Sequence, residues 1–333
     1  MNRVRLGVIG LGFMGSRWTR ALAEHPAARV TVVSDLREDL GREVAARHGA
    51  VFIADPMEAA AHADLDGVAV CTPEHLHVEP AMAAINSGTP VMVEKPLAHT
   101  TEAAESIREG GLSEGVPVLT GHILRFEPRY YAVKRAIEAG DVGAVQAVRS
   151  ERIGLVSDQQ VLRGRTSIAL YYGVHEFDLC RWYAGEVKSI WAVRSSGVLE
   201  SHGYPVEDLY SVGLAFESGA HGTSMVGWSL PPATPGYGMA GFTVIGEHGV
   251  LRISQGEVGL TKVGKGGMLD EDVYYSPEID GRLFGAIGIE ADHFVRVVRG
   301  EAEPRCTAAD GAAAVRIALA MERAATTQEV SRP

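Results

Sequence analysis

The sequence predicts an α/β fold with an N-terminal doubly wound parallel sheet and a C-terminal α/β domain built on a large open, mostly antiparallel sheet. Up to about residue 122, short apolar strands alternate with helical patterns, which is typical of a parallel sheet covered on both faces. From about Val145, strand-like runs are separated by turns such as Glu217-Ser218-Gly219, which indicate antiparallel pairing. We therefore expect two domains, 1–122 and 123–333.

The first domain is expected to contain six short strands. They are preceded or followed by helical segments, of which 15–24 is the clearest because Trp18 and Leu22 share one face. His25-Pro26 ends that helix. The expected strands are 6–10, 30–34, 51–54, 67–71, 90–93 and 117–120.

The second domain is expected to begin with a helix at 128–138. Five strand-like runs follow at 188–193, 208–216, 223–228, 242–246 and 251–254. Three further helices are predicted, one at 173–183 among the strands and two that close the chain at 286–298 and 308–325.

Composition excludes several classes of protein. The 333 residues carry a formal net charge of −11 and no block of Lys and Arg, which disfavours a nucleic-acid partner. The chain enters a strand almost at once, no apolar run is long enough to cross a membrane, and the three cysteines are widely spaced. We therefore expect a cytoplasmic protein with no membrane partner.

A glycine-rich turn follows the first expected strand and opens a helix. Gly10, Gly12 and Gly15 have the spacing of a dinucleotide fingerprint in the strand–turn–helix context that this motif requires. Asp35 ends the second strand, where an acid binds the ribose 2′-hydroxyl and repels a 2′-phosphate. This favours NAD, although Arg37 two residues later leaves NADP open. The first domain is thus predicted to be a Rossmann domain.

The segment 71–77 ends another apolar strand, at the sheet edge where ligands bind in open α/β folds. Cys71, His75 and His77 raise the possibility of a metal site, but no further ligands stand at zinc spacing, so we predict none. Thr72, Pro73 and one of the histidines are expected to shape the cofactor pocket.

Lys95 is the strongest catalytic candidate. It follows Glu94 at the end of a strand and precedes Pro96, which keeps its backbone extended. A lysine held near a cofactor can donate a hydrogen bond or move a proton, because burial lowers its pKa. The alternative is a strand that ends in two solvated charges.

A second candidate lies at the start of the helix 173–183. His175 and Asp178 share a face at i, i+3 spacing. The histidine could accept a proton from an alcohol near neutral pH, and the aspartate could orient its ring. A structural hydrogen bond between the two is the alternative.

These motifs resemble the Gfo/Idh/MocA family of oxidoreductases over nearly the whole chain. The resemblance rests on GLGFMG at 10–15, CTPEHLH at 71–77, VEKPLA at 93–98, GHILRFEPRY at 121–130 and GVHEFDLCRWYAG at 173–185. It implies an NAD(P)-dependent dehydrogenase that forms a homodimer or homotetramer, with Lys95 and His175 as catalytic residues. Tyr171 stands where the family commonly has an aspartate, so Tyr171 or Asp178 is expected to support the proton transfer.

The resemblance and the residues together predict oxidation of a secondary hydroxyl of a sugar, a cyclitol or a sugar derivative, with NAD as the cofactor. Two alternatives stay open: an enzyme that holds NAD tightly and returns the hydride within one turnover, and a non-catalytic NAD-binding regulator. The residues expected around the cofactor are Gly10, Gly12, Phe13, Met14, Gly15, Asp35, Thr72, Pro73, His77, Glu94 and Lys95. Those expected around the substrate are Lys95, His122, Arg125, Tyr171, Tyr172, His175 and Asp178.

Overall fold

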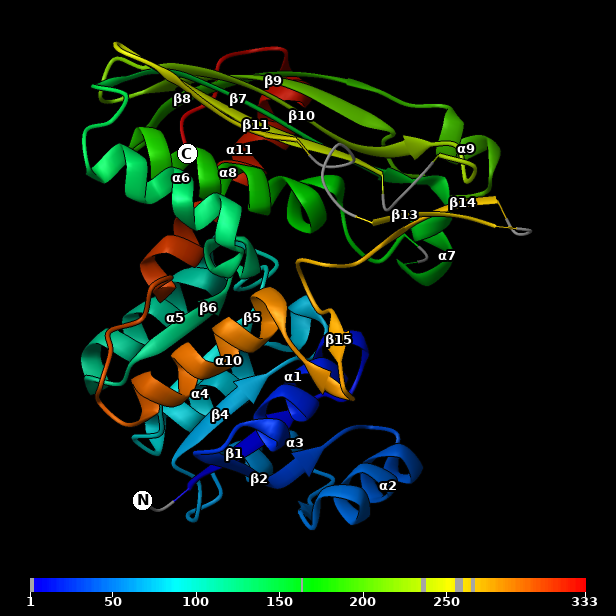
Figure 1. Ribbon diagram of the computed structural model, residues 1–333, viewed down its shortest axis with the longest axis vertical. Coiled ribbons are helices and arrows are strands. Elements are labelled where there is room, and N and C mark those ends of the chain that lie inside the picture. The colour runs from blue at the N-terminus through cyan, green and yellow to red at the C-terminus, as the bar shows by residue number, and fades with distance from the viewer. Residues whose placement is uncertain (1–2, 163, 235–237, 255–259, 265–266) are drawn as a thin grey trace. The chain divides into compact units, whose positions relative to one another are not determined.

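The computed structural model describes residues 3–162, 164–234, 238–254, 260–264 and 267–333. The chain divides into two compact units, which we describe separately. Unit 1 comprises residues 1–127 and 274–315, and unit 2 comprises residues 128–273 and 316–333. The two units are coloured along the chain in Figure 1.

Unit 1 is built on a six-stranded parallel sheet with the order β3-β2-β1-β4-β5-β6, which confirms the predicted Rossmann topology. The predicted strands agree with the observed ones to within about two residues at most ends. Central strands are buried on both faces, which explains their continuous apolar sequence. The strands are β1 (Val4–Ile9), β2 (Ala28–Ser34), β3 (Val51–Phe52), β4 (Gly67–Val70), β5 (Val91–Glu94) and β6 (Val118–Gly121).

Helices of unit 1 follow each strand, and local capping signals set their ends. The Asp55 side chain accepts hydrogen bonds from two backbone N–H groups at the start of α3, and Thr100 does the same for one at the start of α5. Gly49 and Gly115 end α2 and α5 in left-handed conformation. These helices are α1 (Phe13–Glu24), α2 (Glu38–His48), α3 (Pro56–Ala60), α4 (Val78–Asn86) and α5 (Thr101–Glu114), with short 3₁₀ turns η1 (Glu74–Leu76) and η2 (Ile123–Phe126).

The segment 274–315 returns to unit 1. It forms β15 (Glu278–Ile279), β16 (Arg282–Leu283) and α10 (Gly285–Val298), and it contains the start of α11 (Ala308–Thr327). Phe294 of α10 meets Trp18 of α1 edge-on, with 6.2 Å between ring centroids, in a core that also holds Leu6 and Leu22. The grouping of residues by contacts therefore differs from a single division after residue 122, and that domain boundary stays a prediction.

Unit 2 is built on a mixed six-stranded sheet with the order β12-β11-β7-β10-β9-β8. Four of its five pairings are antiparallel and β7 pairs with β10 in parallel, so the prediction of a mostly antiparallel sheet is confirmed. The strand missing from the predicted set is β7 (Val145–Leu155), which occupies the middle of the sheet. The others are β8 (Val187–Ser195), β9 (Leu209–Phe216), β10 (His221–Leu230), β11 (Met239–Gly246) and β12 (Val250–Ser254).

One face of this sheet is covered by helices of unit 2 (Figure 1). Along β9 every second residue, from Tyr210 to Phe216, is buried, as expected for a sheet with one packed face. The remaining elements are α6 (Pro128–Glu138), η3 (Val156–Asp158), α7 (Gln159–Leu162), a π-helix η4 (Ala169–Gly173), α8 (Val174–Ala184), α9 (Val198–Ser201), and the paired strands β13 (Leu260–Gly264) and β14 (Gly267–Glu271).

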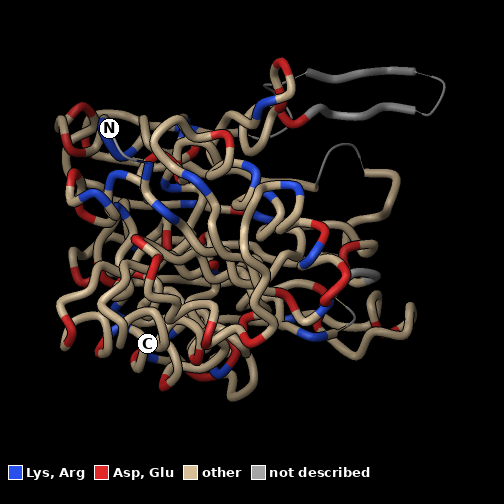
Figure 2. Tube along the Cα trace, turned by 90° about the horizontal axis from the view of Figure 1, so that it is seen from below, with Lys and Arg blue, Asp and Glu red and all other residues tan. Residues whose placement is uncertain are grey.

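Acidic and basic residues are interspersed along the described chain of each unit (Figure 2). Within the described residues, none of the helices combines the length and the apolar character that a bilayer crossing requires.

Candidate active site

The glycine-rich turn lies between β1 and α1, and each glycine has its own geometric reason. Gly10 has φ +86°, a region that other residues rarely adopt. A Cβ on Gly15 would lie 1.8 Å from the carbonyl oxygen of Gly10, so only glycine lets α1 pack against the strand. A Cβ on Gly12 would meet nothing within 4 Å. Gly12 therefore presents open backbone at the start of the helix, which fits the approach of a diphosphate.

Asp35 lies just beyond the end of β2 and is tied to this turn. Its Oδ2 accepts a hydrogen bond of 2.7 Å from the Leu11 backbone N–H, and its Oδ1 accepts from both the backbone and the guanidinium of Arg37. Burial opposes ionisation of Asp35, but the hydrogen bonds from Arg37 and Leu11 outweigh it and lower the pKa. An ionised carboxylate beside the glycine turn can accept hydrogen bonds from the two hydroxyl groups of a ribose. The exposed Arg37 guanidinium forms an ion pair with the same carboxylate.

The segment after β4 is closed by local hydrogen bonds. Thr72 Oγ1 donates to the Leu76 carbonyl, and the His77 ring is 1% exposed with both nitrogens near backbone carbonyl oxygens. Nε2 lies 2.8 Å from Thr72 O and Nδ1 lies 3.0 Å from Pro96 O. The ring nitrogens thus face the protein's own backbone, and the expectation that His77 contacts the cofactor stays a prediction.

Lys95 follows β5 and is anchored through its neighbour Glu94. The Glu94 carboxylate is buried, where Oε1 accepts 2.9 Å from the Trp18 indole and Oε2 accepts 3.1 Å from the Lys95 backbone N–H. Burial raises the pKa of Glu94, against the Trp18 hydrogen bond and the Lys95 charge. The peptide bond between Lys95 and Pro96 is cis. The sequence placed Trp18 only on one face of a helix together with Leu22; its indole N–H, which needs an acceptor when buried, was the available signal for this contact.

A second carboxyl group lies deep in the same unit. Glu290 of α10 is fully buried, and neither of its oxygens has a hydrogen-bond partner among the residues that the structure describes. Burial, and then the neighbouring Glu94 carboxylate, raise the pKa of Glu290 well above its usual range, with Arg305 opposing. The fold therefore favours the protonated form of Glu290 over its carboxylate. No sequence motif pointed to it, since it stands in an otherwise ordinary amphipathic helix.

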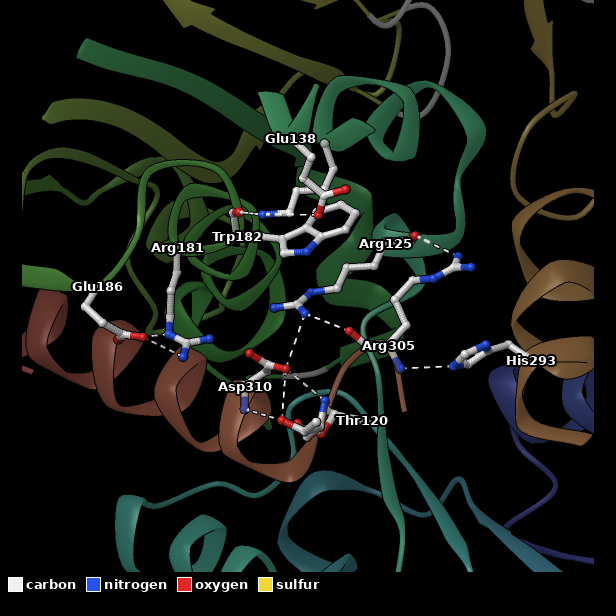
Figure 3. A network of polar contacts seen from close by, with 11 residues as sticks. Thr120, Arg125, Glu138, Arg181, Trp182, Glu186, His293, Arg305 and Asp310 are labelled. Atoms are coloured by element: carbon white, nitrogen blue, oxygen red, sulfur yellow. Dashed lines mark hydrogen bonds and ion pairs between the residues drawn. The ribbon is translucent and has the colours of Figure 1, made fainter. Parts of the chain in front are cut away.

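Arg125, expected at the substrate, is 2% exposed and bonded within unit 1. It donates to the Arg305 carbonyl at 2.9 Å and to the Asp310 carboxylate at 3.3 Å (Figure 3). His122, the other expected pocket residue of this unit, follows β6 and is buried as well. These two contacts of Arg125 are structural, and the substrate role of both residues stays a prediction.

In unit 2, His175 and Asp178 lie one turn apart on α8, as predicted. The helix does not begin abruptly: it continues from the π-helix η4, which carries Tyr171 and Tyr172. Asp178 is 1% exposed and His175 is partly buried. π-turns are rare and occur often at functional sites. The sequence did not predict one here.

Tyr171 and Tyr172 belong to an aromatic cluster with Trp228 of β10. The two tyrosine rings meet at 4.8 Å, and Tyr171 lies 5.8 Å from the Trp228 ring. Tyr172 Oη donates 2.8 Å to Asp158, and a Cβ on Gly154 would come within 2.3 Å of that hydroxyl. Burial, and then the Asp158 charge, raise the pKa of Tyr172, so it is a neutral phenol. Asp158 and Trp228 were not predicted as site residues.

A buried ion pair holds α8 against β7. Arg152 Nε donates 2.6 Å to Glu176, which is 1% exposed and follows His175 directly. Arg152 also donates to the Tyr130 hydroxyl. Burial raises the pKa of Glu176, and the Arg152 charge opposes that rise. The pair fixes the helix turn that carries His175.

Comparison with known proteins identifies the family. Residues 4–122 match the model described as "Oxidoreductase family, NAD-binding Rossmann fold" of Gfo/Idh/MocA proteins, and residues 130–252 match the C-terminal domain model of the same family. A myo-inositol 2-dehydrogenase of Thermotoga maritima is 31% identical over 223 residues, which cover 66% of this chain and 67% of the relative. The chain belongs to the Gfo/Idh/MocA oxidoreductase family. The resemblance inferred from its motifs is thereby confirmed, as is the NAD-binding character of the first domain.

Two further similarities describe the extent of the match. Inositol 2-dehydrogenase 1 of Saccharopolyspora erythraea is 36% identical over 193 residues, and the match covers 54% of each chain. The chain thus spans about half the length of the first curated relatives it matches. The solved structure of GenD2 from gentamicin A biosynthesis, in complex with NAD, is 25% identical and has a TM-score of 0.84, covering 100% of this chain and 97% of that one.

Proposed function

We propose that this protein is an NAD-dependent dehydrogenase that oxidises a secondary hydroxyl of a cyclitol or a related sugar. The observation that carries the proposal is the construction of unit 1, where a glycine turn with an open backbone and an ionised acid stand in the same parallel sheet as the anchored Lys95. Two relatives are named as inositol 2-dehydrogenases, which supports a cyclitol as the substrate class.

NAD, when bound, supplies the hydride acceptor. Gly12 would let its diphosphate approach the start of α1, where Gly10 and Gly15 shape the turn, and Asp35 would accept hydrogen bonds from its adenosine ribose. The predicted neighbours Phe13, Met14, Thr72 and Pro73 belong to the same two loops of unit 1.

In the proposed reaction, Lys95 donates a hydrogen bond to the substrate oxygen and offsets the negative charge that develops there. His175 accepts the proton of the substrate hydroxyl, and the hydride leaves the carbon that bears this hydroxyl. The alcohol becomes a ketone, and the proton stays on the imidazole. Asp178 would orient that imidazole. Tyr171, which replaces the common family aspartate, would contact the substrate together with Tyr172, His122 and Arg125.

The deciding experiment replaces Lys95 by Met and follows NADH formation with a panel of inositols and sugars. Turnover should fall by about 10²- to 10⁴-fold, the usual contribution of a positioned proton-transfer or hydrogen-bonding group, while NAD still binds. Lys188→Met, at an exposed lysine of β8, is the matched control and should be unaffected. Near-normal turnover of Lys95→Met would reject the mechanism. NAD that remains bound through purification, with no net NADH, would instead favour the alternative in which the hydride returns within one turnover.

We also propose that the outer face of the unit 2 sheet forms the interface of a homodimer or homotetramer. Trp191 and Val193 of β8 are 46% and 45% exposed on that face, and Met225 of β10 lies in the same cross-strand row as Val193. Ile245 and Val250 extend the apolar surface over β11 and β12. Trp191→Lys combined with Val193→Lys should lower the mass measured by light scattering after gel filtration. An unchanged mass would reject this face. A cytoplasmic location stays a prediction of the sequence.

A further inference from the structure

His77 occupies the joint between two loops of unit 1. It stands directly before α4, and its ring is 1% exposed. On one side Nε2 lies 2.8 Å from the carbonyl oxygen of Thr72, in the loop that follows β4. On the other side Nδ1 lies 3.0 Å from the carbonyl oxygen of Pro96 and 3.3 Å from that of Leu97, in the loop that follows β5. A single imidazole therefore spans two neighbouring strand ends.

The Pro96 carbonyl belongs to the residue that follows Lys95. The residue that precedes it, Glu94, is fixed as well, because its carboxylate accepts hydrogen bonds from the Trp18 indole and from the Lys95 backbone N–H. The backbone of Lys95 is thus held from both sides, by α1 through Trp18 and Glu94, and by the start of α4 through His77. Glu94 is part of the family motif, whereas the contact from His77 comes from a different loop.

We propose that His77 is a positioning residue for Lys95, which it fixes by joining the carbonyls of Thr72 and Pro96. This inference rests on the proposed function for its effect on turnover, but its geometry does not. The Lys95 ammonium stands at the end of a four-carbon chain, so its position depends on where its backbone is held. A shift of about 1 Å in a positioned group can cost roughly 100-fold in rate, so a loose anchor should appear in kcat.

Burial lowers the pKa of His77, although the hydrogen bonds with the carbonyls of Thr72, Leu97 and Pro96 oppose that shift. A neutral imidazole has a single N–H, so it donates a hydrogen bond to the carbonyl of one of the two loops while its ring packs between both loops. Substitution of His77 by Asn or by Gln distinguishes the contact with Pro96 from the contact with Thr72. Asn places its amide nitrogen near the position of Nδ1, toward Pro96, whereas Gln places it near the position of Nε2, toward Thr72.

The test compares His77→Phe, His77→Asn and His77→Gln, with His75→Phe as the matched control because His75 is exposed in the same segment. We expect His77→Phe to lower kcat about 10- to 100-fold while the Kd for NAD changes less than about threefold. His77→Asn should recover most of that loss and His77→Gln less, because only the first restores a donor toward the Lys95 loop. The control should be normal. An unchanged kcat in His77→Phe overturns the proposal, and so does an equal recovery by Asn and Gln.

A second measurement does not depend on catalysis. Lys95 is one of five lysines in the sequence, so reductive ¹³C-methylation gives a simple NMR spectrum in which Lys95→Arg assigns its signal. His77→Phe should shift or broaden the Lys95 signal and leave the others in place, and an unchanged Lys95 signal overturns the proposal. If Lys95→Met keeps full turnover while this signal still moves in His77→Phe, the proposed function is wrong and the positioning contact stands.

Discussion

Two glycines of the same turn should respond to the same substitution in opposite ways. Gly12→Ala adds a methyl group that meets nothing within 4 Å, at a residue with φ −68° that alanine tolerates. Its cost to stability is that of a weaker helix N-cap, about 1 kcal/mol or less. Gly15→Ala adds a methyl group 1.8 Å from the Gly10 carbonyl oxygen and 3.3 Å from Cys71 Cβ. Backbone has to move there, which costs about 1–3 kcal/mol or more.

Cofactor affinity should show the reverse pattern. If Gly12 lies where the diphosphate approaches, its methyl group displaces one hydrogen bond to a charged group, worth about 1.5–3 kcal/mol. That corresponds to a rise of roughly 10- to 100-fold in the Kd for NAD. Gly15→Ala should weaken binding only as far as it unfolds or loosens the turn.

Chemical denaturation of the free protein and titration with NAD by calorimetry measure the two effects separately. The decisive result is a Gly12→Ala protein that is as stable as the parent and binds NAD poorly. If Gly12→Ala binds NAD within about twofold of the parent, Gly12 does not face the diphosphate. If Gly15→Ala is as stable as the parent, the close contact with Gly10 does not limit packing at this turn.

Three further predictions concern buried or paired charges. The pKa of Glu290 is raised in the folded state, so the folded protein holds a proton that the unfolded chain releases, and stability falls as the pH rises above about 4.3. Glu290→Gln should remove this dependence of stability on pH. In urea titrations, the difference in the free energy of unfolding between Glu290→Gln and the parent should therefore grow with pH. A difference that is the same at every pH would show that Glu290 is not protonated in the folded protein. Arg152→Met leaves the Glu176 carboxylate buried without its ion pair and should cost about 3–5 kcal/mol by denaturation, whereas a loss below about 1 kcal/mol would mean that the pair does not hold α8. Asp35→Ser removes the acid and leaves Arg37, so the ratio of kcat/KM for NAD to kcat/KM for NADP should fall by at least tenfold. An unchanged ratio would show that Asp35 does not select the cofactor.

The sequence determined the first sheet almost completely, because strands buried on both faces are read directly from continuous apolar runs between helical patterns. It also predicted the place of the glycine turn, Asp35 and Lys95 at strand ends, since these depend on local spacing, and the roles of Asp35 and Lys95 stay predictions. The central strand β7 was not predicted because Arg149, Glu151 and Arg152 interrupt its apolar pattern, and their environment is set by β10 and β11, which lie far along the chain.

Only the tertiary structure decided which polar groups are shared between elements. Trp18 meets Glu94, His77 meets the loop after Lys95, and Arg152 meets Glu176, each over a separation of 19 to 76 residues. A sequence pattern reports the preference of a residue for a strand, a helix or a turn, but a buried hydrogen bond depends on which distant group arrives opposite it. For that reason the sequence predicted Lys95 as a catalytic candidate, whereas the groups that hold its backbone in place became visible only in the folded chain.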